Sequence, residues 1–281
     1  MESPEQLLET AVNLPVESWE RWELVQDLHK RGDLETFQAA TALVDSSDPV
    51  RRSLGVDVLA QLGAYPNVPV EDRPFAPKTV RLLLDHLQNE CDPDVLADIA
   101  TAFGHLGDPQ SIPALHDLRN HPVERVRYGV VFGLLAVDDD VAVKTLIELS
   151  ADESADVRDW ATFGLAVQID RDDASLREAL LARLDDLDDD TREEAIRGLA
   201  TRGDLRALPH LLRELDSDRE REDPNRLEEA LLALAASTNG DKRLCEHVRA
   251  IHADWQSGTP DEPLPEDLAA ALRACSESES N

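Results

Sequence analysis

Aromatic residues and lysines are scarce in this chain of 281 residues. Phe, Trp and Tyr together make up 4% of the sequence, and only four residues are lysine. Acidic residues outnumber basic ones by 59 to 28, which leaves a formal charge of −31. So much negative charge repels phosphate backbones and anionic lipid at long range. We therefore expect neither nucleic acid nor a membrane as the main partner.

Cysteine is also scarce. Cys91, Cys245 and Cys275 are odd in number, widely spaced and without a C-x-x-C motif. This pattern favours a reducing compartment over a disulfide framework or a zinc site. The first residues lack the basic and apolar regions of a signal peptide, and no apolar run approaches the roughly 20 residues that span a bilayer. The sequence thus predicts a cytoplasmic protein.

The most informative feature is an internal repeat. The stretch DVRDWATFGL at Asp156 follows the similar RVRYGVVFGL at Arg125 by 31 residues. In each copy the apolar residues recur at helical spacing, and a second helical segment follows a Gly or Asp turn. We call the first helix of each copy the Val-Arg helix. Such a period is typical of stacked helix pairs, none of which buries its apolar face alone. Further copies begin at Val50, Val95, Thr191 and, more weakly, Arg226.

One copy, VLADIATAFGHLGDPQSIPALHDL from Val95 to Leu118, is similar to the short HEAT repeat, the kind also called the phycobilisome-lyase HEAT-like repeat. The resemblance covers about Asp33 to Gly240. It implies an all-α fold, a right-handed α-solenoid (an alpha-alpha superhelix) of HEAT-like helix pairs, with the Val-Arg helices on its concave side. We expect about twelve to fifteen helices and no sheet.

Two stretches interrupt the rhythm of the repeat. Residues 64–77, AYPNVPVEDRPFAP, contain four prolines, which cannot continue a helix. They predict a projecting loop with Tyr65 and Phe75 exposed on it. A shorter charged excursion covers residues 217–225.

The repeat array is expected to span residues 1–256. The polar composition after Trp255 predicts a mobile tail at 257–281, with one helical segment at Glu266–Cys275.

Arginine follows the first core position in four of the Val-Arg helices. The family resemblance implies that such arginines bond carboxylates or helix ends of the adjoining unit and form a structural ladder; ligand binding is the alternative. Leu96 takes this place in the copy at Val95, so a gap in the ladder is expected there. The ladder residues are Arg51, Arg127, Arg158 and Arg192, with Asp48, Asp156 and Asp190 as candidate acceptors.

Aromatic residues gather on the outward positions of two consecutive Val-Arg helices, at 126–137 and 157–168. Large aromatics framed by arginine are typical of interface hot spots. We therefore hypothesise a partner-binding surface of six residues: Tyr128, Phe132, Trp160, Phe163, Arg197 and His105. The alternative for Phe132 and Phe163 is packing between neighbouring helices, where Gly133 and Gly164 would permit close approach.

Eight histidines raise the question of a metal site. None is followed by Glu, so the His-Glu pairs of the di-iron HEAT-repeat hydroxylases are missing, and His116 and His121 diverge on a helix. No nucleophile elbow, phosphate-binding loop or dinucleotide-binding motif occurs. The sequence predicts no catalytic residue, no cofactor and no bound metal.

These features favour a non-catalytic protein–protein interaction scaffold. It would bind a partner protein or peptide with a basic patch in the concave groove. The main alternative is a chromophore-lyase-like role or another HEAT-repeat factor associated with an enzyme, which the resemblance alone suggests. A HEAT-like DNA-repair glycosylase conflicts with the charge of −31, and a metal-dependent hydroxylase lacks its ligands.

Overall fold

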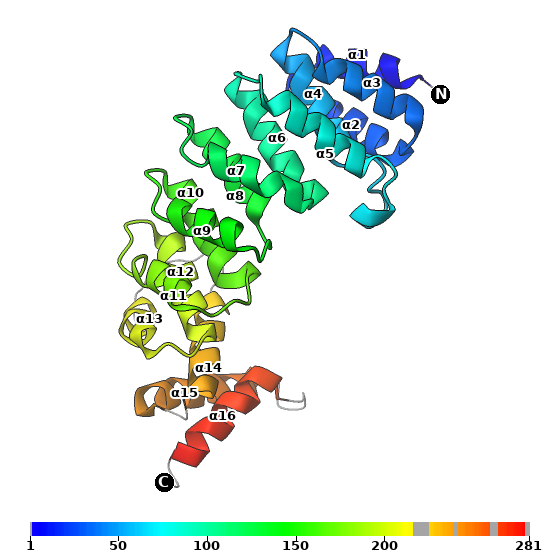
Figure 1. Cartoon of the computed structure of the whole chain (residues 1–281). Helices are drawn as coiled ribbons and strands as arrows, with labels where there is room; N and C mark the ends of the chain where they lie inside the picture. Colours follow the sequence, from blue (N-terminus) through cyan, green and yellow to red (C-terminus); the bar gives the residue numbers. More distant parts are fainter. Residues whose placement is uncertain (1, 216–224, 239–240, 259–263, 279–281) are drawn as a thin grey trace. The chain divides into compact units, whose positions relative to one another are not determined.

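The computed structural model consists of α-helices arranged in pairs and joined by loops (Figure 1). It describes residues 2–215, 225–238, 241–258 and 264–278. Sixteen α-helices occur, and the residues in these ranges form no β-strand. The predicted all-α solenoid of HEAT-like pairs is therefore confirmed. The number of described α-helices is one above the upper end of the expected range of about twelve to fifteen.

The chain divides into two compact units, residues 1–149 and 150–281. The α-helices of the first unit are α1 Pro4–Val12, α2 Trp19–Arg31, α3 Leu34–Val44, α4 Pro49–Ala60, α5 Ala76–Leu87, α6 Pro93–Leu106, α7 Ile112–Leu118, α8 Glu124–Leu134 and α9 Asp140–Leu149. Its 3-10 turns are η1 Val70–Asp72 and η2 Pro109–Ser111. The second unit contains α10 Ala155–Phe163, the π-helix η3 Gly164–Gln168, α11 Ala174–Leu181, α12 Asp189–Thr201, the 3-10 turn η4 Leu205–Ala207, α13 Leu208–Leu215, α14 Asn225–Ser237, α15 Lys242–Gly258 and α16 Glu266–Ser278.

Short polar side chains fix where the Val-Arg helices begin. Asp48 and Asp92 accept backbone N–H bonds at the starts of α4 and α6, and Ser154 and Asp188 do the same for α10 and α12. These bonds satisfy donors that the first turn of a helix leaves open. Gly107, with φ of +58°, ends α6 in the left-handed conformation that favours glycine.

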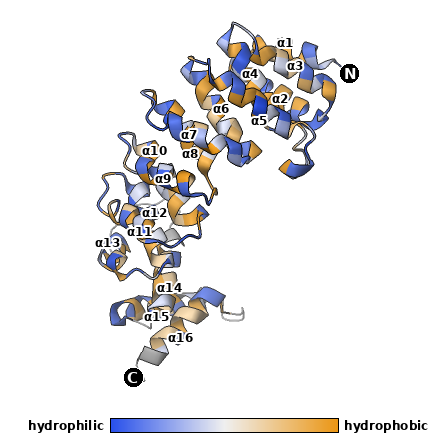
Figure 2. Ribbon diagram, in the orientation of Figure 1, coloured by the Kyte–Doolittle hydropathy of each residue, from blue (hydrophilic) through white to orange (hydrophobic). Residues whose placement is uncertain are grey.

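The Val-Arg helices pack side by side as a row within each unit. This row consists of α4, α6 and α8 in the first unit and of α10, α12 and α14 in the second. A Cβ atom on Gly133 of α8 would lie 2.6 Å from the carbonyl oxygen of Ala100 on α6, so this close approach requires glycine. Hydrophobic residues lie along the helices, and the loops that join them are hydrophilic (Figure 2).

The proline-rich stretch forms a loop, as predicted, but one of its aromatic residues is not exposed. Tyr65 is exposed, whereas Phe75 is buried and stacks on Phe37 of α3, with 4.7 Å between the ring centroids. The prediction for Phe75 was wrong because the loop turns back and inserts this ring against α3. Pro77 stands in the first turn of α5, where a proline removes no helical hydrogen bond.

The C-terminal residues pack against the array instead of leaving it at residue 256. The predicted helical segment is present as α16, which contacts α14 and α15 and buries Leu268 and Ala271. Cys275 on α16 forms a disulfide with Cys245 on α15. The expected tail at 257–281 is thus corrected to a packed helix over its described part.

The expectation against disulfides was also wrong. The two cysteines are 30 residues apart in the sequence, but two antiparallel helices bring their Cα atoms to a distance of 5.5 Å. This distance is within the range of a disulfide, and the sequence alone does not reveal it. Cys91 is exposed and free. The cytoplasmic location stays a prediction. Within the described ranges, no helix has both the length and the apolar character that crossing a bilayer requires. The excursion at 217–225 lies outside the described residues except for Asn225 at the start of α14.

Candidate functional site

Arginines of the Val-Arg helices connect successive helix pairs. Each occupies the fourth position after the N-cap and donates from Nη1 to the carbonyl oxygen six residues earlier, at 3.1 Å for Arg52, 2.9 Å for Arg127, 2.9 Å for Arg158 and 2.8 Å for Arg192. Three of them also pair with a carboxylate, which lies in the loop before the next Val-Arg helix for Arg52 and Arg158 and on α13, in the same helix pair, for Arg192. These pairs are Arg52–Glu90 at 2.7 Å, Arg158–Asp186 at 2.9 Å and Arg192–Glu214 at 3.2 Å.

The first residue of this ladder is Arg52 rather than Arg51. Arg51 lies one position too early and bonds the exposed Glu9 at 2.7 and 2.8 Å. The predicted register of this copy is wrong by one residue because Val50 is exposed and does not hold the first core position. The buried Leu96 holds the matching place in α6.

The carboxylate acceptors also differ from the predicted ones. Arg158 bonds Asp186 in the loop between α11 and α12, and Arg192 bonds Glu214 on α13. Asp156 and Asp190, the predicted acceptors, follow the true N-caps by two residues. The sequence pattern pointed to carboxylates near each arginine in the chain, whereas the long side chains reach carboxylates that lie 28 and 22 residues later.

Strong hydrogen bonding keeps the ladder carboxylates ionised. Burial alone would raise the pKa of Glu90, but bonds from Arg52, the backbone N–H groups of Asp92 and Cys91, and His86 outweigh it and hold this pKa at about 2. Charge-assisted bonds of this kind are shorter and stronger than neutral ones. Similar bonds from Arg158 outweigh burial and lower the pKa of Asp186.

In the first unit, three of the predicted partner-binding residues lie on α6 and α8. The rings of His105 and Phe132 meet edge to face across the two helices, with 5.3 Å between centroids. Burial, together with the nearby charge of Arg73, lowers the pKa of His105 and favours its neutral form. Tyr128 lies one helical turn before Phe132, and both side chains are partly exposed. The packing alternative thus accounts for part of the Phe132 surface.

Charged residues that the sequence hypothesis missed lie on the same row of helices. Arg125 on α8 pairs with Asp98 on α6 at 3.0 Å. Asp57 on α4 reaches solvent, yet protein atoms surround it, and this desolvation together with the charge of Asp98 raises its pKa to about 7. Arg21 and Arg125 oppose the shift. These surroundings therefore favour the protonated form of Asp57 more than water does.

Asp57 is expected to titrate at about pH 7 in the folded protein. Its unfolded-state pKa is about 4, so folding takes up a proton between these values and stability falls as pH rises from about 4 to about 7. Asp57→Asn should therefore be more stable than the wild type at pH 8 and equal to it near pH 4, as measured by urea unfolding. Asp98→Asn should lower the Asp57 midpoint in a carboxyl NMR titration. A wild-type midpoint near pH 4 would contradict this assignment.

In the second unit, the other three predicted residues lie on α10 and α12. Trp160 is 38% exposed and meets Phe163 edge to face, with 5.7 Å between ring centroids. Arg197 on α12 pairs with Glu229 on α14 at 3.4 Å. The six residues of the hypothesised surface therefore form two sets, one per unit, instead of one demonstrated stripe.

The histidines make contacts that need no metal. His29 lies 2.9 Å from the carbonyl oxygen of Asp57, and His116 lies 2.8 Å from the hydroxyl of Thr145. His86 contacts Glu90 at 3.1 Å. In the part of the chain that the structure describes, no three His, Cys, Asp or Glu side chains come together as a metal site.

Comparison with known proteins shows that these helix pairs match HEAT repeats. The sequence model described as HEAT repeats matches residues 80–166 and 143–235. Protein YibA of Escherichia coli strain K12 is 33% identical over 120 residues, which cover 42% of this chain but only 39% of YibA; YibA of E. coli O157:H7 gives the same values.

The similarity in fold to a solved structure covers nearly the whole chain. The X-ray structure of E. coli YibA superposes with a TM-score of 0.69 at 20% identity, over 98% of this chain and 97% of that one. The complex of CpcE and CpcF of phycocyanin lyase from Nostoc sp. PCC7120 gives a TM-score of 0.46 at 16% identity, over 98% of this chain and 94% of that one. The latter value is too low to support the chromophore-lyase alternative.

Proposed function

Because the chain belongs to the HEAT-repeat family, we propose that it is a non-catalytic scaffold that binds a partner protein or peptide on its Val-Arg helices. Stacked repeats supply long continuous surfaces, and proteins of this architecture commonly use them for binding. Fold alone does not fix function, so the proposal depends on the residues of that surface.

The observation that carries the proposal is the exposure of Trp160. An indole that is 38% exposed and rests edge-on against Phe163 offers a large rigid surface to a partner. Such aromatics lose little conformational entropy on docking and dominate many interfaces. In the first unit, Tyr128 and Phe132 supply a second, less exposed aromatic pair.

The charge of the chain supports a partner with a basic patch. A formal charge of −31 attracts cationic surfaces and speeds their association. On α6, which packs against the helix of the first aromatic pair, Asp98 adds negative charge, which Arg125 offsets in part. We therefore propose that acidic residues guide the partner and that the aromatic residues hold it.

Replacing both leading aromatics is expected to weaken the partner at least about tenfold, or about 1.4 kcal/mol. The partner would first be isolated from native extract and purified. The affinity of the Trp160→Ala, Tyr128→Ala double variant would then be measured by calorimetry. Because side-chain contacts govern dissociation, stopped-flow kinetics should show a faster off-rate in the variant and a slower on-rate at higher salt.

The single variants show which unit takes part, since the two residues belong to different units. Val141→Ala, at an exposed apolar residue of the outer helix α9, serves as the control and should bind normally. Normal binding by the double variant, with its helical spectrum intact, would refute the proposed surface.

A further inference from the structure

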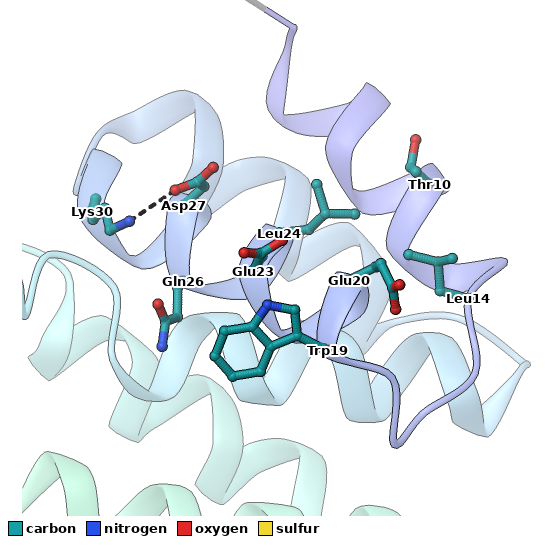
Figure 3. A pocket seen from close by; sticks show the side chains of 9 residues that line it. All are labelled: Thr10, Leu14, Trp19, Glu20, Glu23, Leu24, Gln26, Asp27 and Lys30. Carbon is teal, nitrogen blue, oxygen red and sulfur yellow. Dashed lines mark hydrogen bonds and ion pairs between the residues drawn. The ribbon is translucent and has the colours of Figure 1, made fainter.

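A cavity of about 610 Å³ lies beside the first two helices of the chain and shares no lining residue with the proposed surface of the Val-Arg helices (Figure 3). Leu14 after α1 and Leu24 on α2 form part of its wall. Trp19, the first residue of α2, also lines the cavity. Figure 3 shows the carboxylate of Glu23 beside the indole of Trp19, and that of Glu20 on the other side of the Trp19 backbone, toward Leu14. The cavity therefore combines an aromatic face with negative charge.

Trp19 is unusually accessible for a tryptophan. Its side chain is 67% exposed, and Trp22, one turn later, is 45% exposed. The buried face of α2, which includes Val25 and Leu28, packs toward α1 and α4. Trp19 and Glu23 are four residues apart and share the opposite face of the helix. Packing within the unit therefore leaves the indole open to solvent.

Two carboxylates that line the cavity, those of Glu20 and Glu23, are exposed. Lys30 is close enough to Glu23 for their charges to interact. At the other end of the cavity, Lys30 pairs with Asp27 at 2.9 Å and lies 5.5 Å from the centre of the Tyr65 ring. The protein thus already holds one cation between a carboxylate and an aromatic ring.

We propose that this cavity binds an arginine side chain from a basic segment of a partner protein. A guanidinium group stacks flat on an indole and donates paired hydrogen bonds to a carboxylate, a combination that Trp19 and Glu23 offer, while Glu20 adds negative charge to the same cavity. A neutral or acidic peptide would bring no positive charge to these carboxylates. This inference does not depend on the proposed role of Trp160.

The test uses the full chain and the peptide Ac-Gly-Arg-Gly-NH2, followed by NMR of the tryptophan indole N–H signals. The Trp19 signal should shift in a saturable manner. The citrulline peptide, which has the same shape but no charge, should bind at least about fivefold more weakly. The Glu20→Gln, Glu23→Gln double variant should bind the arginine peptide more weakly. Trp19→Ala removes the indole signal, so its binding is followed through the backbone amide signals of α2 and should be weakened to a similar degree.

Two control variants establish whether the peptide binds in this cavity. Glu35→Gln removes an exposed charge on α3 outside the cavity and should leave binding unchanged. The Trp160→Ala, Tyr128→Ala variant should also bind the peptide normally, so that this test and the test of the proposed function can fail separately. Circular dichroism would verify that each variant is folded.

Three results would overturn the inference. The first is the absence of a saturable shift, and the second is equal binding of the arginine and citrulline peptides. The third is self-association of the chain that Trp19→Ala abolishes while the peptide has no effect, since a second copy would then be the occupant.

Discussion

Replacing Arg158 by alanine should lower the free energy of unfolding by about 2–4 kcal/mol. The side chains of Arg158 and Asp186 are only 15% and 7% exposed, and they share two hydrogen bonds, at 2.9 and 3.1 Å. Arg158 also donates to the carbonyl oxygen of Asp152 at 2.9 Å. Its removal leaves a largely buried carboxylate and a carbonyl oxygen without these donors. Denaturant unfolding with and without any partner would measure the loss.

Arg51 provides a matched control within the same protein. Its two bonds to Glu9 are as short as those of Arg158, but the two side chains are 31% and 55% exposed. Exposed ion pairs contribute about 1 kcal/mol or less, so Arg51→Ala should be nearly neutral, whereas Arg52→Ala should resemble Arg158→Ala. Equal losses for Arg51 and Arg52 would contradict the corrected register of the ladder. If Arg158→Ala kept full stability and lost its partner, Arg158 would be a recognition residue.

The helix pairs could be predicted because sequence patterns within each copy determine where the helices form. Apolar residues at helical spacing, with a capping residue before them and a turn after them, occur in each copy, and Val157 and Leu165 in one such copy are both buried as expected. The position of Arg52 could also have been found, by counting four residues from the N-cap Asp48 instead of matching Val50.

Other features depend on contacts that no local pattern contains. Phe75 is buried because α3 happens to present Phe37 to it. Arg202 donates to the carbonyl oxygens of Leu165 and Ile169 at 3.0 and 2.6 Å and so completes the end of the π-helix η3. Its partners lie more than thirty residues earlier in the chain. Neither contact leaves a sequence signal.

The candidate binding residues were predicted only in part for the same reason. Composition and helical spacing identified Trp160 as an outward aromatic, which agrees with its exposure. Asp57 and Trp19 were missed. The raised pKa of Asp57 arises from protein atoms around it and from Asp98 on another helix. The exposure of Trp19 follows from how α2 packs on its neighbours.

Loss of the Cys245–Cys275 disulfide should destabilise the second unit by about 2–4 kcal/mol. The bond joins residues 30 positions apart, and so limits the freedom of the unfolded chain between α15 and α16. In the folded state both sulfur-bearing side chains are buried, so alanine at the two positions avoids placing a new polar group there. Urea unfolding of the Cys245→Ala, Cys275→Ala double variant would measure this effect.

Cys91 provides a control for the disulfide prediction. It is exposed and free, so Cys91→Ala should leave stability unchanged, and thiol titration of the denatured, unreduced wild type should detect one thiol per chain. Reduced wild type should unfold like the double variant, because both lack the same constraint. The helix α16 should exchange its amide hydrogens faster after reduction, since its apolar face, which includes Leu268 and Ala271 and packs on α14 and α15, then holds it without the covalent bond. Equal stability of the oxidised and reduced proteins would mean that this face alone holds α16 in place.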